Sequence, residues 1–354
     1  MEDDKVKISP HILTAIVSAA VVFVIILAIV LGMNKRPETV TVAQPESTDS
    51  TEEELPDVTY GTGHPEDLDF WDLYPSEKTP DTVPLEEVKE DPLGGEAPDP
   101  ATDGKHTLVV LPDGSEEWVT INRYLPEHTY DYTNLVAQGD MMEYYIDGRK
   151  ASTLGIDVSK YQDYIDFQAV KKAGIDFVMI RAGVRGYTTG QLSLDEMFLD
   201  NLDRASKAGL QIGLYFTSQA LTAEEAEQEA SLILSNIGEA VITYPIAIDM
   251  GYVDNDTARI EGLTRTEKTE VTKAFLDTIA KGGYTAMIKG NKEWLIKEID
   301  LSKLTDYDIW LCQNQDLPDY PYQFSMWQYK LSGKVSGVTG YVSMDICFVD
   351  YTAK

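Results

Sequence analysis

The sequence predicts an α/β fold, an irregular TIM-like barrel of eight strands within residues 151–354. Eight short strand-like runs follow one another in this part of the chain, and helical patterns separate the early runs. Strands that alternate with helices form a parallel sheet through right-handed crossovers, and eight such strands in one domain close into a barrel. The pattern predicts five βα units followed by three strands with little helix between them.

The predicted strands are rich in apolar, β-branched and aromatic residues, and turn-forming residues bound them. Parallel strands of a barrel bring their carboxyl ends to one face, where barrel enzymes carry their chemistry. The eight runs are Gly155–Val158, Phe177–Ala182, Gln211–Phe216, Pro245–Asp249, Thr285–Ile288, Asp308–Cys312, Phe324–Tyr329 and Met344–Val349.

The helices between these strands are predicted from apolar residues that recur at helical spacing and from capping residues. Thr222 and Thr264 each precede a helical run and have a glutamate three residues later, which is the capping-box pattern. The predicted helices are Phe167–Ala173, Leu194–Ala208, Ala223–Ile237, a run from Thr264 to Lys281, and Trp294–Ile299.

Two segments of different character precede the barrel. Residues 104–150 regain apolar character, and two strand-like runs flank the turn Asp113-Gly114, which predicts a small β-rich segment without a chemical signal. Residues 34–103 are rich in Glu, Asp, Pro, Thr and Ser, and they are too polar to bury an apolar core. We expect them to form a disordered, acidic, self-repelling stalk.

Residues 12–33 form one apolar run without a charged residue. Such a run is long enough to cross about 30 Å of hydrocarbon as a helix. No A-x-A-like cleavage site follows it, which favours an uncleaved signal anchor over a cleaved signal peptide. Residues 1–11 are then a short cytoplasmic N-terminus. Lysine and arginine lie on both sides of the run, so charge alone leaves its orientation open.

Composition excludes several classes of function. A formal net charge of −31 argues against a nucleic-acid partner, because phosphate binding requires a basic surface. The two cysteines, Cys312 and Cys347, lie in no metal-binding pattern, and the sequence predicts no metal and no cofactor. Two free thiols and one disulfide remain alternatives for them, and the oligomeric state also remains open.

Three aspartates lie at or near the ends of predicted strands: Asp157, Asp249 and Asp345. The first and the last strand are neighbours in a closed barrel, so these carboxylates are expected near one rim. Carboxylates that lie close together raise one another's proton affinity. Cleavage of a glycosidic bond needs such a pair, one group as an acid and one as a carboxylate.

Residues 155–162 (GIDVSKYQ), 245–251 (PIAIDMG) and 326–329 (MWQY) resemble segments of the family 25 glycoside hydrolases, the muramidase-type lysozymes. The resemblance covers about Leu154 to Tyr351. It implies an irregular barrel, the three aspartates as catalytic residues, and no cofactor. It also implies a partner, bacterial peptidoglycan, cut at the β-1,4 bond between N-acetylmuramic acid and N-acetylglucosamine. A wall substrate places the C-terminal domain outside the cell, on a single-pass membrane protein.

Aromatic residues are expected to bind the sugar rings, because sugars stack their C–H faces on aromatic planes. Tyr215 lies on the third predicted strand, and Trp327 and Tyr329 lie on one face of the seventh. The alternative is that these rings fill the barrel core. Lys289, on the fifth strand, is a further candidate for substrate binding.

The chain departs from the family pattern at two positions. The family has Asp-x-Glu on the fourth strand, with the glutamate as the acid, and here that position is Gly251. Lys289 stands where relatives have a tyrosine, and a cation there holds neighbouring carboxylates ionised. The sequence therefore leaves two hypotheses, a muramidase with impaired activity and a peptidoglycan-binding pseudoenzyme. An unrelated barrel enzyme is a third alternative.

Overall fold

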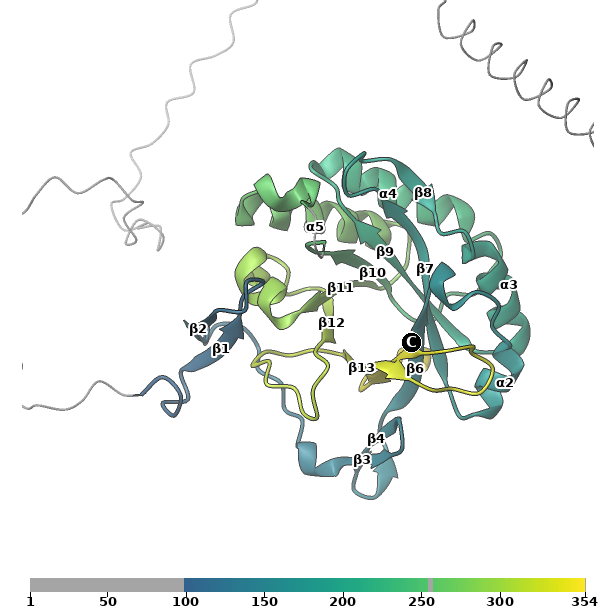
Figure 1. The fold of residues 1–354 in the computed structure, drawn as a ribbon, viewed down its shortest axis with the longest axis horizontal. Helices are drawn as coiled ribbons and strands as arrows, with labels where there is room; N and C mark the ends of the chain where they lie inside the picture. Colours follow the sequence, from purple (N-terminus) through teal and green to yellow (C-terminus); the bar gives the residue numbers. More distant parts are fainter. Residues whose placement is uncertain (1–98, 254–256, 354) are drawn as a thin grey trace, which may run out of the picture. The chain divides into compact units, whose positions relative to one another are not determined.

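The computed structural model describes residues 99–253 and 257–353 (Figure 1). The predicted membrane span at residues 12–33 and nearly all of the predicted stalk lie outside these residues. Among the helices that are described, none combines the length and the apolar character that a membrane span requires.

Eight strands form a closed barrel, as the sequence predicts. Their hydrogen-bonded order is β6-β14-β13-β12-β11-β10-β9-β7, and pairing of β6 with β7 closes the ring. A ninth strand, β8 (Leu192–Leu194), pairs with β7 outside the ring. The barrel strands are β6 (Thr153–Val158), β7 (Phe177–Arg185), β9 (Gln211–Ser218), β10 (Ile246–Met250), β11 (Ala286–Asn291), β12 (Asp308–Cys312), β13 (Met326–Gly333) and β14 (Val342–Cys347).

The expectation of parallel strands is wrong for the last one. β14 runs antiparallel to both of its neighbours, β13 and β6. The short connection from Gly333 to Val342 contains no crossover helix, and a parallel return needs such a crossover. The reversal lowers Asp345 into the barrel, because Asp345 pairs with Gly155 whereas Ser343 pairs with Asp157.

Four helices cover the outer side of the barrel (Figure 1). The two predicted caps are present, since Thr222 caps one helix and Thr264 forms a capping box with Glu267. Two predicted helices differ from the structure. The helix predicted to begin at Leu194 starts at Phe198 because Leu192–Leu194 is strand β8, and residues 294–298 form a single π-helical turn. The helices are α2 (Phe167–Lys172), α3 (Phe198–Ala208), α4 (Ala223–Asn236) and α5 (Arg265–Lys281).

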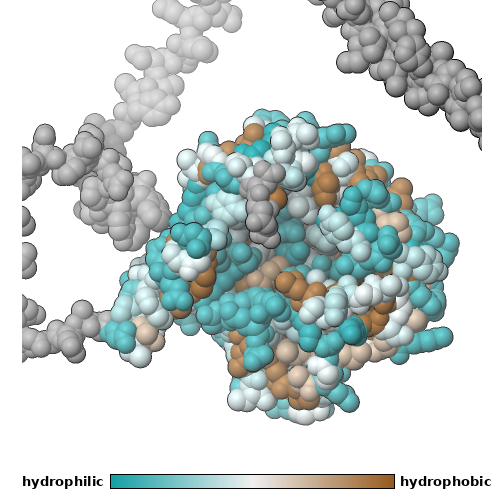
Figure 2. Space-filling model, viewed as in Figure 1, coloured by the Kyte–Doolittle hydropathy of each residue, from teal (hydrophilic) through white to brown (hydrophobic). Residues whose placement is uncertain are grey.

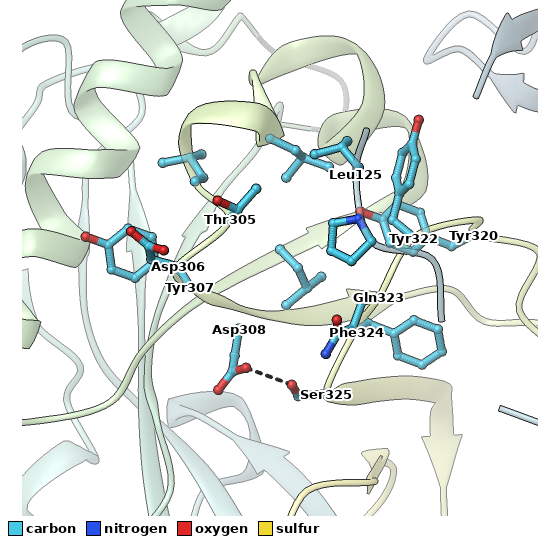
Figure 3. A pocket seen from close by; sticks show the side chains of 14 residues that line it. Leu125, Thr305, Asp306, Tyr307, Asp308, Tyr320, Tyr322, Gln323, Phe324 and Ser325 are labelled. Carbon is cyan, nitrogen blue, oxygen red and sulfur yellow. Dashed lines mark hydrogen bonds between the residues drawn. The ribbon is translucent and has the colours of Figure 1, made fainter. Parts of the chain in front are cut away.

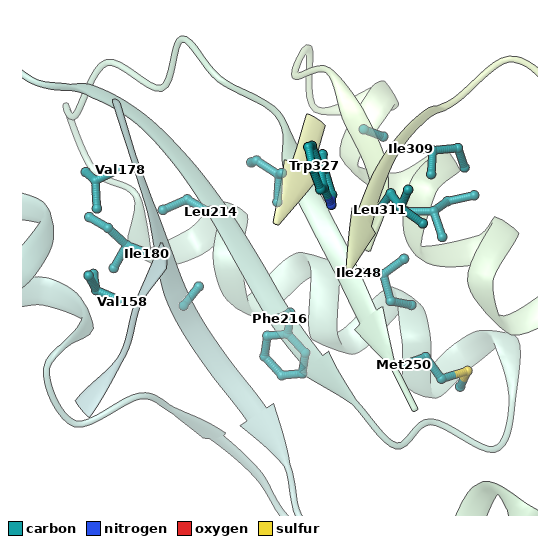
Figure 4. Close-up of a cluster of buried hydrophobic side chains, with 14 of the residues drawn as sticks. Val158, Val178, Ile180, Leu214, Phe216, Ile248, Met250, Ile309, Leu311 and Trp327 are labelled. Atoms are coloured by element: carbon teal, nitrogen blue, oxygen red, sulfur yellow. The ribbon is translucent and has the colours of Figure 1, made fainter. Parts of the chain in front are cut away.

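The barrel strands have two apolar faces, because successive side chains point to opposite sides of a sheet. The outer face carries mainly aliphatic residues such as Ile180, Leu214 and Ile248, and it packs against the helices (Figure 4). The inner face carries larger rings. Tyr215 of β9 contacts Trp310 of β12 although two strands separate them, so both rings lie inside the barrel.

The segment before the barrel forms two small antiparallel sheets. One is the hairpin of β1 (His106–Val110) and β2 (Glu116–Thr120), and the other joins β3 (Leu135–Gln138), β4 (Met141–Ile146) and β5 (Arg149–Lys150). The second sheet packs on the barrel through the ring of Tyr144, which meets Phe348 edge-on at 5.4 Å.

A cavity of about 110 Å³ lies between this segment and the barrel (Figure 3). Leu125 closes one side of it, and Asp308, at the amino end of β12, accepts a hydrogen bond from Ser325 at 2.9 Å. The cavity contains none of the aspartates that the sequence singles out.

Candidate active site

The site is built at the carboxyl ends of the parallel strands, on the inner face of the barrel. Asp157 is the next-to-last residue of β6, and Asp249 is the next-to-last residue of β10. Strand alternation turns both side chains away from the outer core, which holds Ile156 and Ile248. The face seen in Figure 2 is hollowed near its centre, within the ring of strands in Figure 1.

Asp249 forms an ion pair with Lys289 of β11. The Nζ of Lys289 lies 2.9 Å from Oδ2 of Asp249, and the ammonium also lies over two rings, 4.6 Å from the centroid of Tyr215 and 4.8 Å from that of Trp310. Burial lowers the pKa of Lys289, but the charge of Asp249 and other negative neighbours outweigh burial and raise this pKa well above its usual value. Lys289 is therefore a fixed cation that holds Asp249, rather than a side chain free to bind substrate.

The surroundings of Asp157 differ from those of Asp249. Its side chain is buried, and Oδ2 accepts a hydrogen bond from Nε2 of Gln328 at 2.5 Å. Burial raises the pKa of Asp157 above its usual value, and the charge of Lys289 and the hydrogen bonds from Gln328 and Ser343 only partly oppose this rise. Asp157 is thus a carboxyl group that tends to keep its proton close to an ion-paired carboxylate.

Asp345 lies deeper in the barrel than the sequence predicts. Its side chain is fully buried, and Oδ1 accepts a hydrogen bond from Nε1 of Trp310 at 2.8 Å. Its other oxygen has no hydrogen-bond partner within the described part of the chain. Burial, followed by repulsion from Asp157, raises the pKa of Asp345 well above its usual value. Asp345 therefore lies below the opening and does not border it.

Of the three predicted sugar-stacking rings, only Tyr215 lies on the inner face of the barrel, with the carboxylates. Its ring is 5% exposed and meets Trp310 at right angles, so it forms part of the floor. The placement of Trp327 and Tyr329 in the groove is wrong. Both rings are buried on the outer face of β13, where Trp327 donates to the carbonyl of Gln313 at 2.7 Å and Tyr329 donates to that of Asp140 at 2.8 Å.

Two site residues were missed from the sequence, Gln328 and Trp310. Gln328 lies between Trp327 and Tyr329 on β13, so alternation places it inside the barrel when its neighbours point outside. The alternation was visible in the sequence. The sequence did not show which of the alternating residues face the inside of the barrel, because β13 is buried on both faces and carries large apolar residues on each.

Gly251 follows directly after β10, at the rim. A Cβ atom built there would meet no other atom within 4 Å, and the backbone at Gly251 is not left-handed. The carbonyl of Gly251 accepts a hydrogen bond from Nε2 of Gln219 at 2.8 Å, which fixes the peptide. The position therefore has room for a longer side chain, such as that of glutamate.

The described residues contain no group of three or more His, Cys, Asp or Glu side chains placed to hold a metal ion. Cys312 and Cys347 are both free thiols, and Cys347 donates to the carbonyl of Val349 at 3.3 Å. Burial raises the pKa of each thiol, so neither is a ready nucleophile.

Comparison with known proteins finds a matching family and similar proteins for the barrel. The family model for glycosyl hydrolases family 25 matches residues 156–338. The autolytic lysozyme of Clostridium acetobutylicum is 27% identical over 198 residues, which are 54% of this chain and 54% of that protein. The chain therefore spans about half the length of this curated relative.

Two solved structures are also similar. The bacterial lysozyme from Streptomyces coelicolor shares 24% identity and a TM-score of 0.45, with 55% of this chain and 90% of that chain covered. The spore cortex lytic enzyme SleM of Clostridium perfringens shares 22% identity and a TM-score of 0.47, with 57% and 69% covered.

Proposed function

Because this chain belongs to the glycosyl hydrolases family 25, we propose that it is a muramidase-type lysozyme acting on bacterial peptidoglycan. The bond it would cut is the β-1,4 bond between N-acetylmuramic acid and N-acetylglucosamine. The observation that carries the proposal is the pair of unlike carboxyl groups in one barrel mouth. Asp157 tends to hold a proton, and Asp249 is ion-paired with Lys289.

The two groups divide the work of glycoside cleavage. Asp157 donates its proton to the glycosidic oxygen as the bond from the anomeric carbon to that oxygen breaks. Asp249, ion-paired with Lys289, stabilises the positive charge that develops on the sugar ring. Water then adds to the anomeric carbon and returns a proton to the site. Gln328 orients Asp157 for the first step.

The same geometry predicts slow turnover. Asp157 is only 7% exposed and is held by Gln328, so it reaches a bound glycan less readily than a glutamate at the rim would. Gly251 offers no carboxyl group in the place where the family pattern has its acid. A general acid typically contributes about 10²- to 10⁴-fold to the rate.

The missing acid also favours a second candidate, a peptidoglycan-binding protein that does not cleave. The mouth keeps Asp249, whose side chain is 28% exposed, above a floor that contains Tyr215, and a polar glycan could bind there without reacting. The two candidates differ in one observable, the release of new reducing ends.

The assay uses the full-length chain and purified peptidoglycan. A muramidase releases reducing ends in proportion to enzyme, and heat-inactivated protein serves as the blank. Retention of the chain on insoluble peptidoglycan without release of reducing ends would contradict the muramidase and support the binding protein. Neither release nor retention would overturn both candidates.

For localisation, the proposal is a single-pass membrane protein with the barrel outside the cell. It is supported by the uncharged run at residues 12–33, by the acidic segment that follows, and by a substrate outside the membrane. Protease added to intact cells without a wall should digest the barrel and spare a cytoplasmic control protein. Protection of the barrel until the cells are lysed would contradict this topology.

A further inference from the structure

A cavity of about 470 Å³ lies between the β3–β4 hairpin and the outer end of β13. Ala137 and Met141 line it from the hairpin, Asn314 and Asp316 from the loop after β12, and Lys330 from β13. The hairpin precedes residue 156, where the family match begins, so one wall of this cavity is an addition to the family domain.

The hairpin is fixed to the barrel at its tip, which makes the cavity a built feature. Asp140, in the turn between β3 and β4, accepts a hydrogen bond from Nζ of Lys330 at 2.6 Å and another from the backbone of Lys334 at 3.0 Å. Its carbonyl accepts from the hydroxyl of Tyr329 at 2.8 Å. The three contacts hold the turn in place, and the ion pair with Lys330 engages the carboxylate of Asp140 within the protein.

The opposite wall is connected to the active site. The loop after β12 begins at Gln313, whose backbone donates to the carbonyl of Gln328 at 3.1 Å. Gln328 in turn holds Asp157 at 2.5 Å. The cavity therefore lies beside the catalytic mouth, at the outer side of the strand that positions one catalytic carboxyl group.

The lining suits a peptide better than a sugar. Asn314 and Gln315 are exposed amides that pair with peptide groups, and Met141 and Met142 are flexible apolar surfaces. The one ring on the lining, Tyr329, is only 6% exposed, so it offers no plane for a sugar to stack on. Asp316 is exposed and forms no ion pair within the described residues, so its carboxylate is available to an amine.

We propose that this cavity binds an amine-bearing peptide branch of the glycan whose backbone lies in the catalytic mouth. The inference rests on the proposed peptidoglycan substrate and adds a second point of attachment to it. The ammonium group pairs with Asp316, the amides of the loop pair with the branch, and the hairpin closes the site from the side.

The test compares soluble peptidoglycan fragments that keep their peptide branches with the same fragments after enzymatic removal of the peptides. The full-length chain should bind the branched fragments about tenfold more tightly, the value of one charge-assisted hydrogen bond. Asp316→Asn should abolish most of this preference, and so should acetylation of the amines on the fragments. Ala137→Trp should abolish it by filling the cavity.

Each variant has a matched control. Asp306→Asn makes the same change at an exposed aspartate before β12, and Val136→Trp places the same ring on the other face of β3. Both controls should keep the preference. Equal affinity of the unaltered chain for the two fragments, or a preference that survives Asp316→Asn and Ala137→Trp, would overturn the branch site while leaving the proposed function intact. Binding of neither fragment would overturn the proposed function and the branch site together.

Discussion

Gly251→Glu is expected to raise the release of reducing ends from peptidoglycan by about 10²- to 10⁴-fold. The reason is geometric. Gly251 directly follows the end of β10, two residues after Asp249, so a glutamate there is expected on the same side as Asp249 and at the open rim. A Cβ atom there meets nothing within 4 Å, so the side chain enters without displacing a neighbour.

The control for this variant is Gly262→Glu. Gly262 is also free of neighbours within 4 Å of a built Cβ atom, it has no left-handed backbone, and it lies on a surface turn. Gly262→Glu adds the same charge and should leave the rate unchanged. If Gly251→Glu also leaves the rate unchanged, the proton comes from another group or the site lacks more than its acid.

Asp249→Asn is expected to abolish release and to lower the free energy of unfolding by about 3 kcal/mol. The stability loss arises because the change leaves the buried ammonium of Lys289 without the carboxylate 2.9 Å away. The loss falls at the low end for broken buried pairs, since the side chain of Asp249 is 28% exposed. Urea unfolding and the reducing-end assay measure the two effects separately.

A double variant separates the effect of Asp249 on stability from its effect on catalysis. Asp249→Asn combined with Lys289→Met removes both members of the pair, and most of the lost stability should return while release stays absent. Asp203→Asn is the control, because its pair with Lys207 is exposed and is worth less than about 1 kcal/mol. Release by the double variant at the unaltered rate would show that Asp249 is not part of the reaction.

The candidate site divides into residues that sequence placed correctly and residues that it could not place. Asp157 and Asp249 lie near the carboxyl ends of strands whose periodicity is clear, and both lie at the barrel mouth. Asp345 is on the strand expected, but that strand is reversed, so the carboxyl group lies deeper and is fully buried. The expected strand ends, Tyr329 and Met344, left room for a crossover, whereas β13 continues to Gly333 and β14 starts at Val342, so the real connection is too short for a parallel return.

The aromatic residues illustrate a different limit. Trp327 and Tyr329 share a face, as the period of two requires, but that face is the outer one. A strand buried on both sides carries apolar residues on each face, so its sequence does not distinguish inside from outside. Because Trp327 and Tyr329 were assigned to the inner face, Gln328, which holds Asp157, was not predicted as a site residue.

The sequence by itself determined the eight strands, the capped helices and the family, because these depend on local periodicity and residue identity. Only the tertiary structure decided the direction of β14, the pairing of Lys289 with Asp249, and the cavity beneath the β3–β4 hairpin. These features arise where segments far apart in the chain meet. Burial and charge there depend on neighbours that local sequence does not specify.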